Sequence, residues 1–447
     1  MYEVSYLVEG NKTSRPYLIF NANTGNLLFE IDNLQHDEAT GPGGNLKTGH
    51  YAYGSDYKHL DVQRTNNTCI LENSKVKTIN MNHGTTATKA HTFGCPENTV
   101  KQINGAYSPL NDAHYFATTV HDMYKNWLGK APLSSKLIVR VHYPSNLPSA
   151  FWNGSSMTFG DGGPKSHPFT SLDIISHEIA HGFTAQNSNL FYFDQSGGLS
   201  EAFSDMAGEA AEYYVNNENN FLFASEITKF DDAIRYMNNP TQDGLSIAHT
   251  TDHTFALDVH FSSGVYNKAF YNLATTKGWD TKKAFLVMAR ANEIHWTQFT
   301  NWNVAATGVM DAACEMGYST ADVKSALEKV GLTASLSPSK RCKTTTPQIG
   351  QETLITNPRQ RKWVRHVQKL PSGYNTLTVR ISGGTGNADL YLEHNKKPRK
   401  KRFICSSAKS GNQEVCRIDN PAAGDWHIGI YGVNRNDTGI IMDVSAY

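Results

Sequence analysis

The 447-residue sequence has no long uninterrupted hydrophobic run and no excess of one charge sign. No segment approaches the ~18 apolar residues of a membrane-spanning helix, so no membrane span is expected. Lys and Arg together number 41, as do Asp and Glu, and this balance argues against nucleic acid as the main partner. At 39% the hydrophobic content is too high for a disordered chain, and it predicts folded globular domains.

Cysteine is also scarce, and none of the six cysteines belongs to a C-x-x-C metal or redox motif. They fall into three sequence-local pairs: Cys69 with Cys95, Cys314 with Cys342, and Cys405 with Cys416. This pattern favours three structural disulfides in an exported protein over free thiols in a cytosolic one, although six cysteines allow fifteen pairings. The N-terminus lacks the basic and apolar regions of a signal peptide, so we expect that the chain is not exported or does not begin at its natural start.

The first part of the chain is expected to be rich in strands. Residues 2–31 mix apolar and polar residues around the turn-forming residues 23–26, which predicts three short antiparallel strands. The next segment, ATGPGGN at residues 39–45, contains Gly-Pro-Gly-Gly, which disfavours both helix and paired strand. We therefore expect exposed, flexible chain there, with a proteolytic processing boundary near Asp37 or Glu38.

Short strands are expected to continue to about residue 139, and helices follow. Apolar residues recur at helical spacing in four segments, around residues 114–127, 171–183, 200–215 and 265–276. Residues 336–350 are rich in Ser, Thr, Pro and Lys, which predicts a linker. Beyond it, the patterns LTVRI, ADLYLE, WHIGIY and IIMDVSAY predict a β-sandwich of ~100 residues.

The segment SHEIAHG, residues 176–182, contains the pattern H-E-x-x-H. In a helix, His177 and His181 project from one face one turn apart, so both rings can bind one zinc ion. Glu178 would then lie beside the open coordination position. Taken alone, the motif is equally compatible with two surface histidines on an amphipathic helix.

A third zinc ligand is predicted in GGLSEAFSD, residues 197–205. Glu201 is expected to open a second helix behind the Gly-Gly break. Two histidines and one carboxylate leave the fourth zinc position for water, as a catalytic site requires. Asp205, one turn later on the same face, is placed to accept the second ring N–H of a zinc-binding histidine. The alternative is an ordinary Glu/Asp pair on a helix surface.

These motifs resemble those of the thermolysin-type zinc metalloproteases, and most closely the secreted vibriolysin and pseudolysin branch. The resemblance runs from about residue 2 to residue 332 and includes AFWNGSSMTFGDGG, SLDIISHEIAHGFTAQNS, SGGLSEAFSDMAGEAAEYY, RYMNNPTQDG and DVHFSSGVYNKAFY. It implies an α+β fold with a two-lobed catalytic domain, zinc in the cleft, and a small β-sandwich after it. The implied parts are a propeptide remnant (1–37), a strand-rich N-terminal lobe that includes the zinc-motif helix (38–185), a helical C-terminal lobe (186–335), a linker (336–350) and the sandwich (351–447).

The resemblance also implies roles for individual residues. His177, His181 and Glu201 match the zinc ligands. Glu178 matches the residue that takes a proton from water and passes it to the leaving amine. His260 and Tyr192 match the pair that donates hydrogen bonds to the oxyanion, Asp258 matches the carboxylate that orients this histidine, and Arg235 matches the residue that binds a substrate carbonyl.

The substrate pocket is expected to be apolar but altered in shape. Ile174 and Ile234 match walls of the pocket for the residue after the cut, so cleavage before Leu-, Phe- or Val-like residues is expected. Ser149, which precedes Ala150 in the substrate-binding segment, stands where the family usually has asparagine, and its hydroxyl cannot make the same paired contact. The positions where bulkier residues are common in the family are occupied by Ser166, His167 and Phe169.

A structural calcium ion is the second implied cofactor. The matching ligands are the carboxylates of Asp173, Glu209 and Glu212, the side chain of Asn220 and the backbone carbonyl of Leu222. Without a cation these carboxylates, on two adjacent helices, would repel one another. Asn220 stands where the branch has an aspartate, so the missing negative charge is expected to weaken calcium binding. The alternative is a pair of solvated acidic helix faces.

The resemblance further implies a secreted, extracellular, monomeric enzyme that acts on proteins and peptides, with its own propeptide as inhibitor and folding aid. Residues 1–37 resemble the end of that propeptide, so Met1 is expected to begin a truncated chain. The family pairs Cys69 with Cys95 and Cys314 with Cys342.

The last hundred residues resemble the bacterial C-terminal pre-peptidase domain through GGTGNADLYLE, SGNQEVCRI and GDWHIGIYG, with Asn387 in place of a common aspartate. Residues 347–447 contain 15 Lys and Arg but 8 Asp and Glu, and six of these basic residues lie in KKPRKKR, from Lys396 to Arg402. This turn is a candidate contact for an anionic surface or polysaccharide. A solvated charge run with no partner is the alternative.

Two functions of different class remain open on the sequence. One is a secreted zinc-dependent endopeptidase. The other is a non-catalytic secreted binding module with a structural zinc site. Glu178, His260, Tyr192 and Arg235 favour the endopeptidase, because a structural site needs neither a base nor oxyanion donors.

Overall fold

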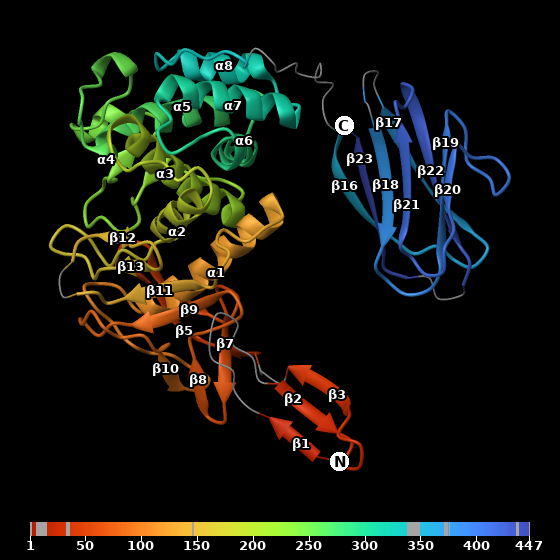
Figure 1. The fold of residues 1–447 in the computed structure, drawn as a ribbon, viewed down its shortest axis with the longest axis horizontal. Coiled ribbons are helices and arrows are strands. Elements are labelled where there is room, and N and C mark those ends of the chain that lie inside the picture. Colours follow the sequence, from red (N-terminus) through yellow and green to blue (C-terminus); the bar gives the residue numbers. More distant parts are fainter. Residues whose placement is uncertain are drawn as a thin grey trace. The chain divides into compact units, whose positions relative to one another are not determined.

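The computed structural model describes residues 2–5, 16–32, 36–144, 147–337, 349–370, 374, 376–434 and 438–446. The chain forms two compact bodies, residues 1–312 with 321–337, and residues 338–447 with 313–320 (Figure 1). Strands and helices are mixed in the first body and the second is rich in strands, which confirms the predicted α+β class. Within the described ranges no helix is long and apolar enough to cross a membrane. Most of the predicted linker, residues 338–348, lies outside the described residues.

The N-terminal strands form a small antiparallel sheet in the order β1-β2-β3. Their bounds are β1 (Tyr2–Ser5), β2 (Pro16–Phe20) and β3 (Leu27–Asp32). The turn between the last two is closed by a hydrogen bond of 2.9 Å from the Gly25 amide to the Asn21 carbonyl. The three predicted strands are therefore confirmed.

The prediction of exposed, flexible chain at residues 39–45 is wrong. This segment contains β5 (Gly41–Asn45), which pairs with β6 (Gly49–Tyr53), and four of the five β5 residues are buried. The glycines serve close packing: a Cβ at Gly41 would lie 2.3 Å from the Asn98 carbonyl oxygen, and one at Gly43 would lie 2.5 Å from an Asp112 carboxylate oxygen. The predicted processing boundary falls inside β4 (His36–Ala39), which pairs with β7 (Leu60–Thr65).

Asp112 is a buried carboxylate beneath β5 and β6. It accepts hydrogen bonds from the hydroxyls of Tyr51 (3.0 Å) and Tyr53 (2.8 Å) and from the Gly44 amide (3.2 Å). Burial raises the pKa of Asp112 to about 7, although these hydrogen bonds act in the opposite direction. The ionised carboxylate is thus costly in the folded protein.

Replacing Asp112 by asparagine is expected to remove a pH-dependent loss of stability. The pKa of an unfolded Asp is ~3.9, so the native state binds the extra proton between about pH 4 and pH 7 and stability falls as the pH rises through that window, by at most ~4 kcal/mol. Urea unfolding at pH 5 and pH 8, in an inactive background with saturating metal ions, should give Asp112→Asn a gain over the parent that is larger at pH 8 than at pH 5, by ~3 kcal/mol. The exposed Asp231→Asn serves as control, and equal gains for Asp112→Asn at both pH values would contradict the assignment.

Beside α1 (Pro109–Leu128) the first body also has two four-stranded sheets, one of which contains β4 and β7 (Figure 1). The first sheet has the order β10-β8-β7-β4. It adds β8 (Thr68–Ile70) and β10 (Thr92–Gly94) to the pair β4 and β7. The second, in the order β12-β13-β11-β9, consists of β9 (Val76–Asn80), β11 (Leu137–Val141), β12 (Ala150–Trp152) and β13 (Met157–Phe159). The edge strand β12 carries the predicted substrate-binding segment.

Helices dominate the rest of this part of the chain, as predicted. They are α2 (Leu172–Gln186), α3 (Asp194–Asn216), α4 (Val259–Ser262), α5 (Gly264–Ala274), α6 (Thr281–Ile294), α7 (Trp302–Met316) and α8 (Thr320–Glu328). Short elements lie between α3 and α4: β14 (Leu222–Phe223), β15 (Arg235–Tyr236), η1 (Pro240–Asp243) and η2 (Thr250–Asp252). Helices α2 and α3 pack against each other, and Gly208 allows a close approach, because a Cβ there would lie 3.0 Å from the Asp173 carbonyl oxygen.

The expected helix start at Glu201 is wrong. Helix α3 begins at Asp194, so Gly197 and Gly198 lie within its first turns and do not break it. A Cβ at Gly197 would lie 2.4 Å from a Val259 methyl, and one at Gly198 would lie 2.3 Å from the Ser262 hydroxyl. The two glycines therefore let α4 pack directly on α3.

The second body is a β-sandwich, as predicted. Its two four-stranded antiparallel sheets have the orders β16-β23-β18-β21 and β17-β22-β19-β20. The strands are β16 (Ile349–Thr356), β17 (Trp363–Leu370), β18 (Thr376–Ser382), β19 (Ala388–His394), β20 (Cys405–Ser407), β21 (Glu414–Asp419), β22 (Gly424–Gly432) and β23 (Ile440–Ala446). The core between the sheets is centred on the buried ring of Trp426 and on branched side chains such as Val379 and Leu390.

Two of the predicted disulfides are present. Cys69 is bonded to Cys95, and Cys405 to Cys416, which links the two sheets of the sandwich through β20 and β21. Cys314 is disulfide-bonded as well, but its predicted partner, Cys342, lies outside the described residues.

Candidate metal and active site

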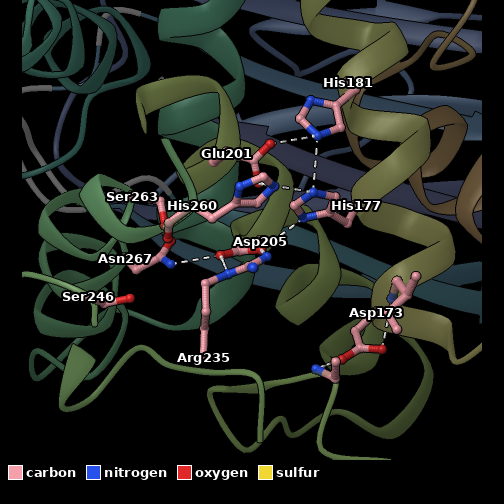
Figure 2. Close-up of polar contacts among 12 residues, drawn as sticks. Asp173, His177, His181, Glu201, Asp205, Arg235, Ser246, His260, Ser263 and Asn267 are labelled. Atoms are coloured by element: carbon pink, nitrogen blue, oxygen red, sulfur yellow. Dashed lines mark hydrogen bonds and ion pairs between the residues drawn. The ribbon is translucent and has the colours of Figure 1, made fainter. Parts of the chain in front are cut away.

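Three predicted zinc ligands converge between α2 and α3 (Figure 2). His177 Nε2 lies 3.0 Å from His181 Nε2, and the two nitrogens lie 3.4 Å and 3.2 Å from oxygens of Glu201. Among the residues that the structure describes, this is the only group of three or more His, Cys, Asp or Glu side chains whose ligand atoms all lie within 4.8 Å of one another.

The geometry of this group fits a tetrahedral zinc ion. Two atoms bonded at ~2.05 Å to one tetrahedral ion lie ~3.3 Å apart, close to the separations observed. Glu201 is fully buried, and its Oε2 has no hydrogen-bond partner among the described residues. Burial raises the pKa of Glu201, but His181 and His177 lower it further, to well below its usual range. The carboxylate is therefore ionised, as a zinc ligand must be.

Asp205 connects this group to its surroundings, as Figure 2 shows. His177 Nδ1 donates to Asp205 Oδ1 at 2.8 Å, which leaves a lone pair on Nε2 for a metal. Arg235 makes two parallel bonds to the same carboxylate, from Nε (2.7 Å) and Nη2 (2.6 Å), and Asn267 Nδ2 adds a fourth at 2.8 Å. All four residues are buried, so the orientation of the His177 ring is closely defined.

Glu178 lies one residue beyond His177 and faces the same cavity. Its side chain is buried, and its Oε2 has no hydrogen-bond partner in the described part of the chain. Burial raises the pKa of Glu178, although the neighbouring His177 and His181 act in the opposite direction. A buried carboxylate oxygen without a partner is available for a substrate or a water molecule.

The predicted oxyanion donors also lie beside Glu201. The Tyr192 hydroxyl donates to Glu201 Oε1 and lies 3.4 Å from His260 Nε2. Asp258 holds the histidine in place, since its Oδ1 lies 2.8 Å from His260 Nδ1 and accepts the His260 amide at 2.9 Å. Desolvation and the Glu201 carboxylate raise the pKa of Tyr192, so its hydroxyl remains a neutral donor.

Two pockets meet at these residues, and both are lined by Ser149, Ala150, His177, Glu178 and His260. The first, of about 580 Å³, is also lined by Ile174, Ile234, Arg235 and Phe169, as the resemblance implies. The second continues along His181, Glu201 and Tyr192 to Asn189 and Leu190. Of the substituted pocket positions, Ser166 and His167 line neither pocket.

Sequence reasoning missed two contributors. Phe223 lines the first pocket, with its ring centroid 4.2 Å below the Arg235 guanidinium carbon and 5.0 Å from the His177 ring. Asn267 fixes Asp205 from α5. Neither carries a sequence signal, because a single Phe in β14 and a single Asn in an amphipathic helix are unremarkable without the fold.

The predicted calcium carboxylates form a buried cluster at the other end of α2 and α3. Glu209 Oε2 accepts bonds from Asn219 Nδ2 (2.6 Å) and the Phe221 amide (2.8 Å), whereas its buried Oε1 has no partner among the described residues. Burial raises the pKa of Glu209 to about 8, and the nearby Asp173 adds to this shift. Burial and the charge of Glu209 likewise raise the pKa of Glu212.

Two features of this cluster differ from the expectation. The three carboxylates do not all bring ligand atoms within 4.8 Å of one another. A further acid, Glu226, lies close enough to Asp173 that burial and this neighbour raise the pKa of Glu226 to about 7. The exposed Asn220 caps the adjacent turn, accepting the Leu222 amide at 2.7 Å.

The mixed fold, the two-histidine and one-glutamate site and the adjoining peptide-sized cleft define a zinc metalloendopeptidase. Residues 46–185 match the family described as thermolysin metallopeptidase, catalytic domain, and residues 188–332 match its alpha-helical domain. The chain belongs to the thermolysin metallopeptidase family. Residues 369–432 match the bacterial pre-peptidase C-terminal domain.

Individual relatives agree with this assignment. The chain is 42% identical to the neutral protease of Vibrio proteolyticus, covering 97% of this chain and 72% of the relative. It is 41% identical to the hemagglutinin/proteinase of Vibrio cholerae, covering 99% and 73%. Among solved structures, the precursor of protealysin from Serratia proteamaculans is similar in fold, with a TM-score of 0.52 and 22% identity, covering 59% of this chain and 89% of that one.

Proposed function

We propose that this metalloendopeptidase is secreted and cuts proteins on the amino side of hydrophobic residues. The observation that carries the proposal is the buried, unpartnered Glu178 oxygen beside the triangle of His177, His181 and Glu201, at the junction of two pockets. A purely structural zinc site would need neither the open cavity nor the free carboxylate oxygen.

In this proposal, His177, His181 and Glu201 hold the zinc ion. When bound, zinc lowers the pKa of a bound water to ~7 and polarises the substrate carbonyl. Glu178 takes a proton from the attacking water and transfers it to the leaving amine.

His260 and Tyr192 donate hydrogen bonds to the oxyanion that develops at the scissile carbonyl, and losing one such donor typically costs ~3 kcal/mol of transition-state stabilisation. Asp258 keeps the His260 ring oriented. Arg235 offers a substrate carbonyl its remaining Nη1, which makes no bond to a described residue.

The first pocket is proposed to bind the residue after the cut. Its walls include Ile174, Ile234 and Phe223, which suit an apolar side chain. Phe223 is larger than an aliphatic wall residue and narrows this space. The Ser149 hydroxyl bonds to the Ala150 carbonyl at 3.1 Å, so its contact with substrate backbone is weaker than a two-point amide contact.

The remaining assignments of the sequence analysis stay predictions. They include secretion, monomeric state, the propeptide remnant at residues 1–37, the other domain boundaries, and a calcium ion bound by Asp173, Glu209, Glu212, Asn220 and Leu222. The N-terminal strands expose several apolar side chains, among them Leu27, Leu28 and Phe29. Exposed apolar side chains of this kind suit a contact with another protein surface, which supports the propeptide prediction.

The basic turn of the sandwich also stays a predicted contact for an anionic polysaccharide or surface. Its position on the sheet supports the prediction, because Arg365 Nη1 donates to the Pro398 carbonyl at 3.0 Å and Lys400 Nζ lies 3.8 Å from the Tyr431 ring centroid. These contacts hold the turn on an aromatic surface while most of its lysines and arginines remain exposed.

The proposal is tested by digesting an unfolded casein-type protein and sequencing the new amino termini. We expect Leu, Phe and Val to dominate the residue after each cut. Activity should be lost with a zinc chelator and return with added zinc. A folded, zinc-loaded protein that cut nothing would favour the non-catalytic binding module, and new termini dominated by charged residues would contradict the proposed pocket.

A further inference from the structure

Four phenylalanine rings form an exposed aromatic surface directly beside the active site. Phe191, Phe193, Phe255 and Phe299 have exposed fractions of 49%, 43%, 81% and 73%. Their rings form a continuous series: Phe255 to Phe193 at 5.7 Å, Phe193 to Phe191 at 6.4 Å and Phe191 to Phe299 at 5.7 Å between centroids. We call these four residues the phenylalanine surface. Exposed apolar side chains gathered in this way typically mark a binding site.

The surface is continuous with the substrate cleft. Tyr192, which lines the second pocket, stands between Phe191 and Phe193 in the chain. The Phe193 amide donates to the Phe191 carbonyl at 2.8 Å, which makes a tight turn with Tyr192 at its centre, so the two flanking rings lie together while Tyr192 lines the cleft. A polypeptide that leaves the second pocket past Tyr192 therefore reaches the phenylalanine surface at once.

The phenylalanine surface adjoins the second pocket, and this position indicates which part of a substrate would reach the surface. If the first pocket binds the residue after the cut, the second pocket takes the residues before it, since the two share His177, Glu178 and His260. Neighbouring rings 5.7–6.4 Å apart give the surface a length that matches about five extended residues at ~3.4 Å each.

The residues around the rings favour a neutral, apolar polypeptide. The groove that contains all four rings is otherwise lined by Asp194, Gln195, Ser196, Thr300, Asn301, Asn303 and Val304, with no Lys or Arg. Its one charged group, Asp194, lies 3.1 Å from His253 Nε2. A surface that binds anionic lipid would carry basic residues around its apolar centre. The side-chain amides of Gln195, Asn301 and Asn303 can instead hydrogen-bond the backbone of an extended peptide.

We propose that the phenylalanine surface binds an apolar segment of the substrate protein several residues before the scissile bond. The inference rests on the proposed function, because the cleft supplies the continuity. Such a contact would favour unfolded or loosely folded substrates, in which apolar segments are accessible, over short peptides.

The test uses two peptides that share one cleavage sequence and differ in a ten-residue extension before it, one rich in Phe and Leu, the other in Ser and Gly. With wild-type enzyme we expect kcat/KM to be about tenfold higher for the apolar extension, mainly through a lower KM. Phe255→Ser/Phe299→Ser should reduce this ratio to nearly one while hydrolysis of the Ser/Gly peptide is unchanged. Phe230→Ser, at a side chain that is also exposed (59%) but lies away from the groove, should keep the full ratio.

Several results would overturn the inference. The double variant could keep the tenfold preference, or it could lose activity equally on both peptides, which would mean that the rings only support the Tyr192 segment. Sedimentation that shows a dimer dissociating in the double variant, with the preference retained, would assign the surface to a second copy of the chain. A zinc-loaded wild type that cuts neither peptide would instead refute the proposed peptidase function itself.

Discussion

Replacing Glu178 by glutamine is expected to lower kcat/KM for peptide hydrolysis by about 10²–10⁴-fold, the usual contribution of a general acid–base group. The amide cannot take a proton from water, although it has the same shape. The side chain is buried with an unpartnered oxygen at the junction of both pockets, so this oxygen is available to the attacking water. The measurement is steady-state cleavage of a peptide with an apolar residue after the cut.

Zinc content and thermal stability distinguish a lost base from a lost site. Glu178 is not among the three converging ligands, so Glu178→Gln should bind zinc stoichiometrically and unfold at or slightly above the wild-type temperature, because it removes a buried carboxylate. Glu218→Gln, on the exposed surface, should be fully active. A zinc-loaded Glu178→Gln variant with more than a tenth of the wild-type activity would exclude Glu178 as the base.

The arrangement of the zinc ligands was predictable because it depends on local geometry. A helix places His177 and His181 on one face whatever surrounds it, and this spacing needs no knowledge of the fold. The convergence of Glu201 and Asp205 on the two histidines required more, namely that α2 and α3 pack face to face. Family resemblance supplied that tertiary information, and the structure brings the four side chains together.

Glycine misled the sequence analysis twice for the same physical reason. Gly-Pro-Gly-Gly in β5 and Gly197-Gly198 in α3 were expected to end regular structure, because glycine has the greatest conformational freedom. In both places another element lies so close that a Cβ would overlap it, as with Asp112 beside β5 and Val259 beside α3. A single sequence does not distinguish a glycine that bends the chain from one that admits a neighbour.

The contacts that Phe223 and the phenylalanine surface make between distant segments could not be predicted from the sequence. Phe223 and Arg235 lie on paired strands, and Phe223 also contacts His177, 46 residues earlier in the chain. The phenylalanine surface joins residues 191–193, 255 and 299 in the same way. No residue of either group has a spacing that suggests the others, because loops bring them together.

Removing calcium is expected to lower the thermal unfolding temperature of the catalytic domain by about 10 °C. An ion present at 1,000 times its Kd stabilises the folded state by ~4 kcal/mol, which corresponds to a shift of that size in a large domain. The physical reason is the buried cluster of Asp173, Glu209 and Glu212, with Glu226 close by, where an unpartnered Glu209 oxygen is available to a cation. Thermal unfolding is followed against calcium concentration, with zinc saturating and an inactive Glu178→Ala background to prevent self-digestion.

Asn220 makes the prediction specific to this chain. Asn220→Asp restores the charge found in the related branch, so calcium should reach half-saturation at about a tenfold lower concentration, an increase of ~1.4 kcal/mol in binding free energy. Without calcium the same substitution adds a negative charge beside carboxylates that already repel one another, so its unfolding temperature should fall below that of the parent. Asn220→Asp should therefore stabilise the folded protein when calcium is present and destabilise it when calcium is absent. Neither a general effect on the helix nor a new surface ion pair would produce this change of sign. Asn66→Asp, in an exposed turn, should show no such reversal. If the unfolding temperatures of the parent and of Asn220→Asp do not change with calcium concentration, there is no calcium site here. The carboxylates would then be a neutralised acidic cluster.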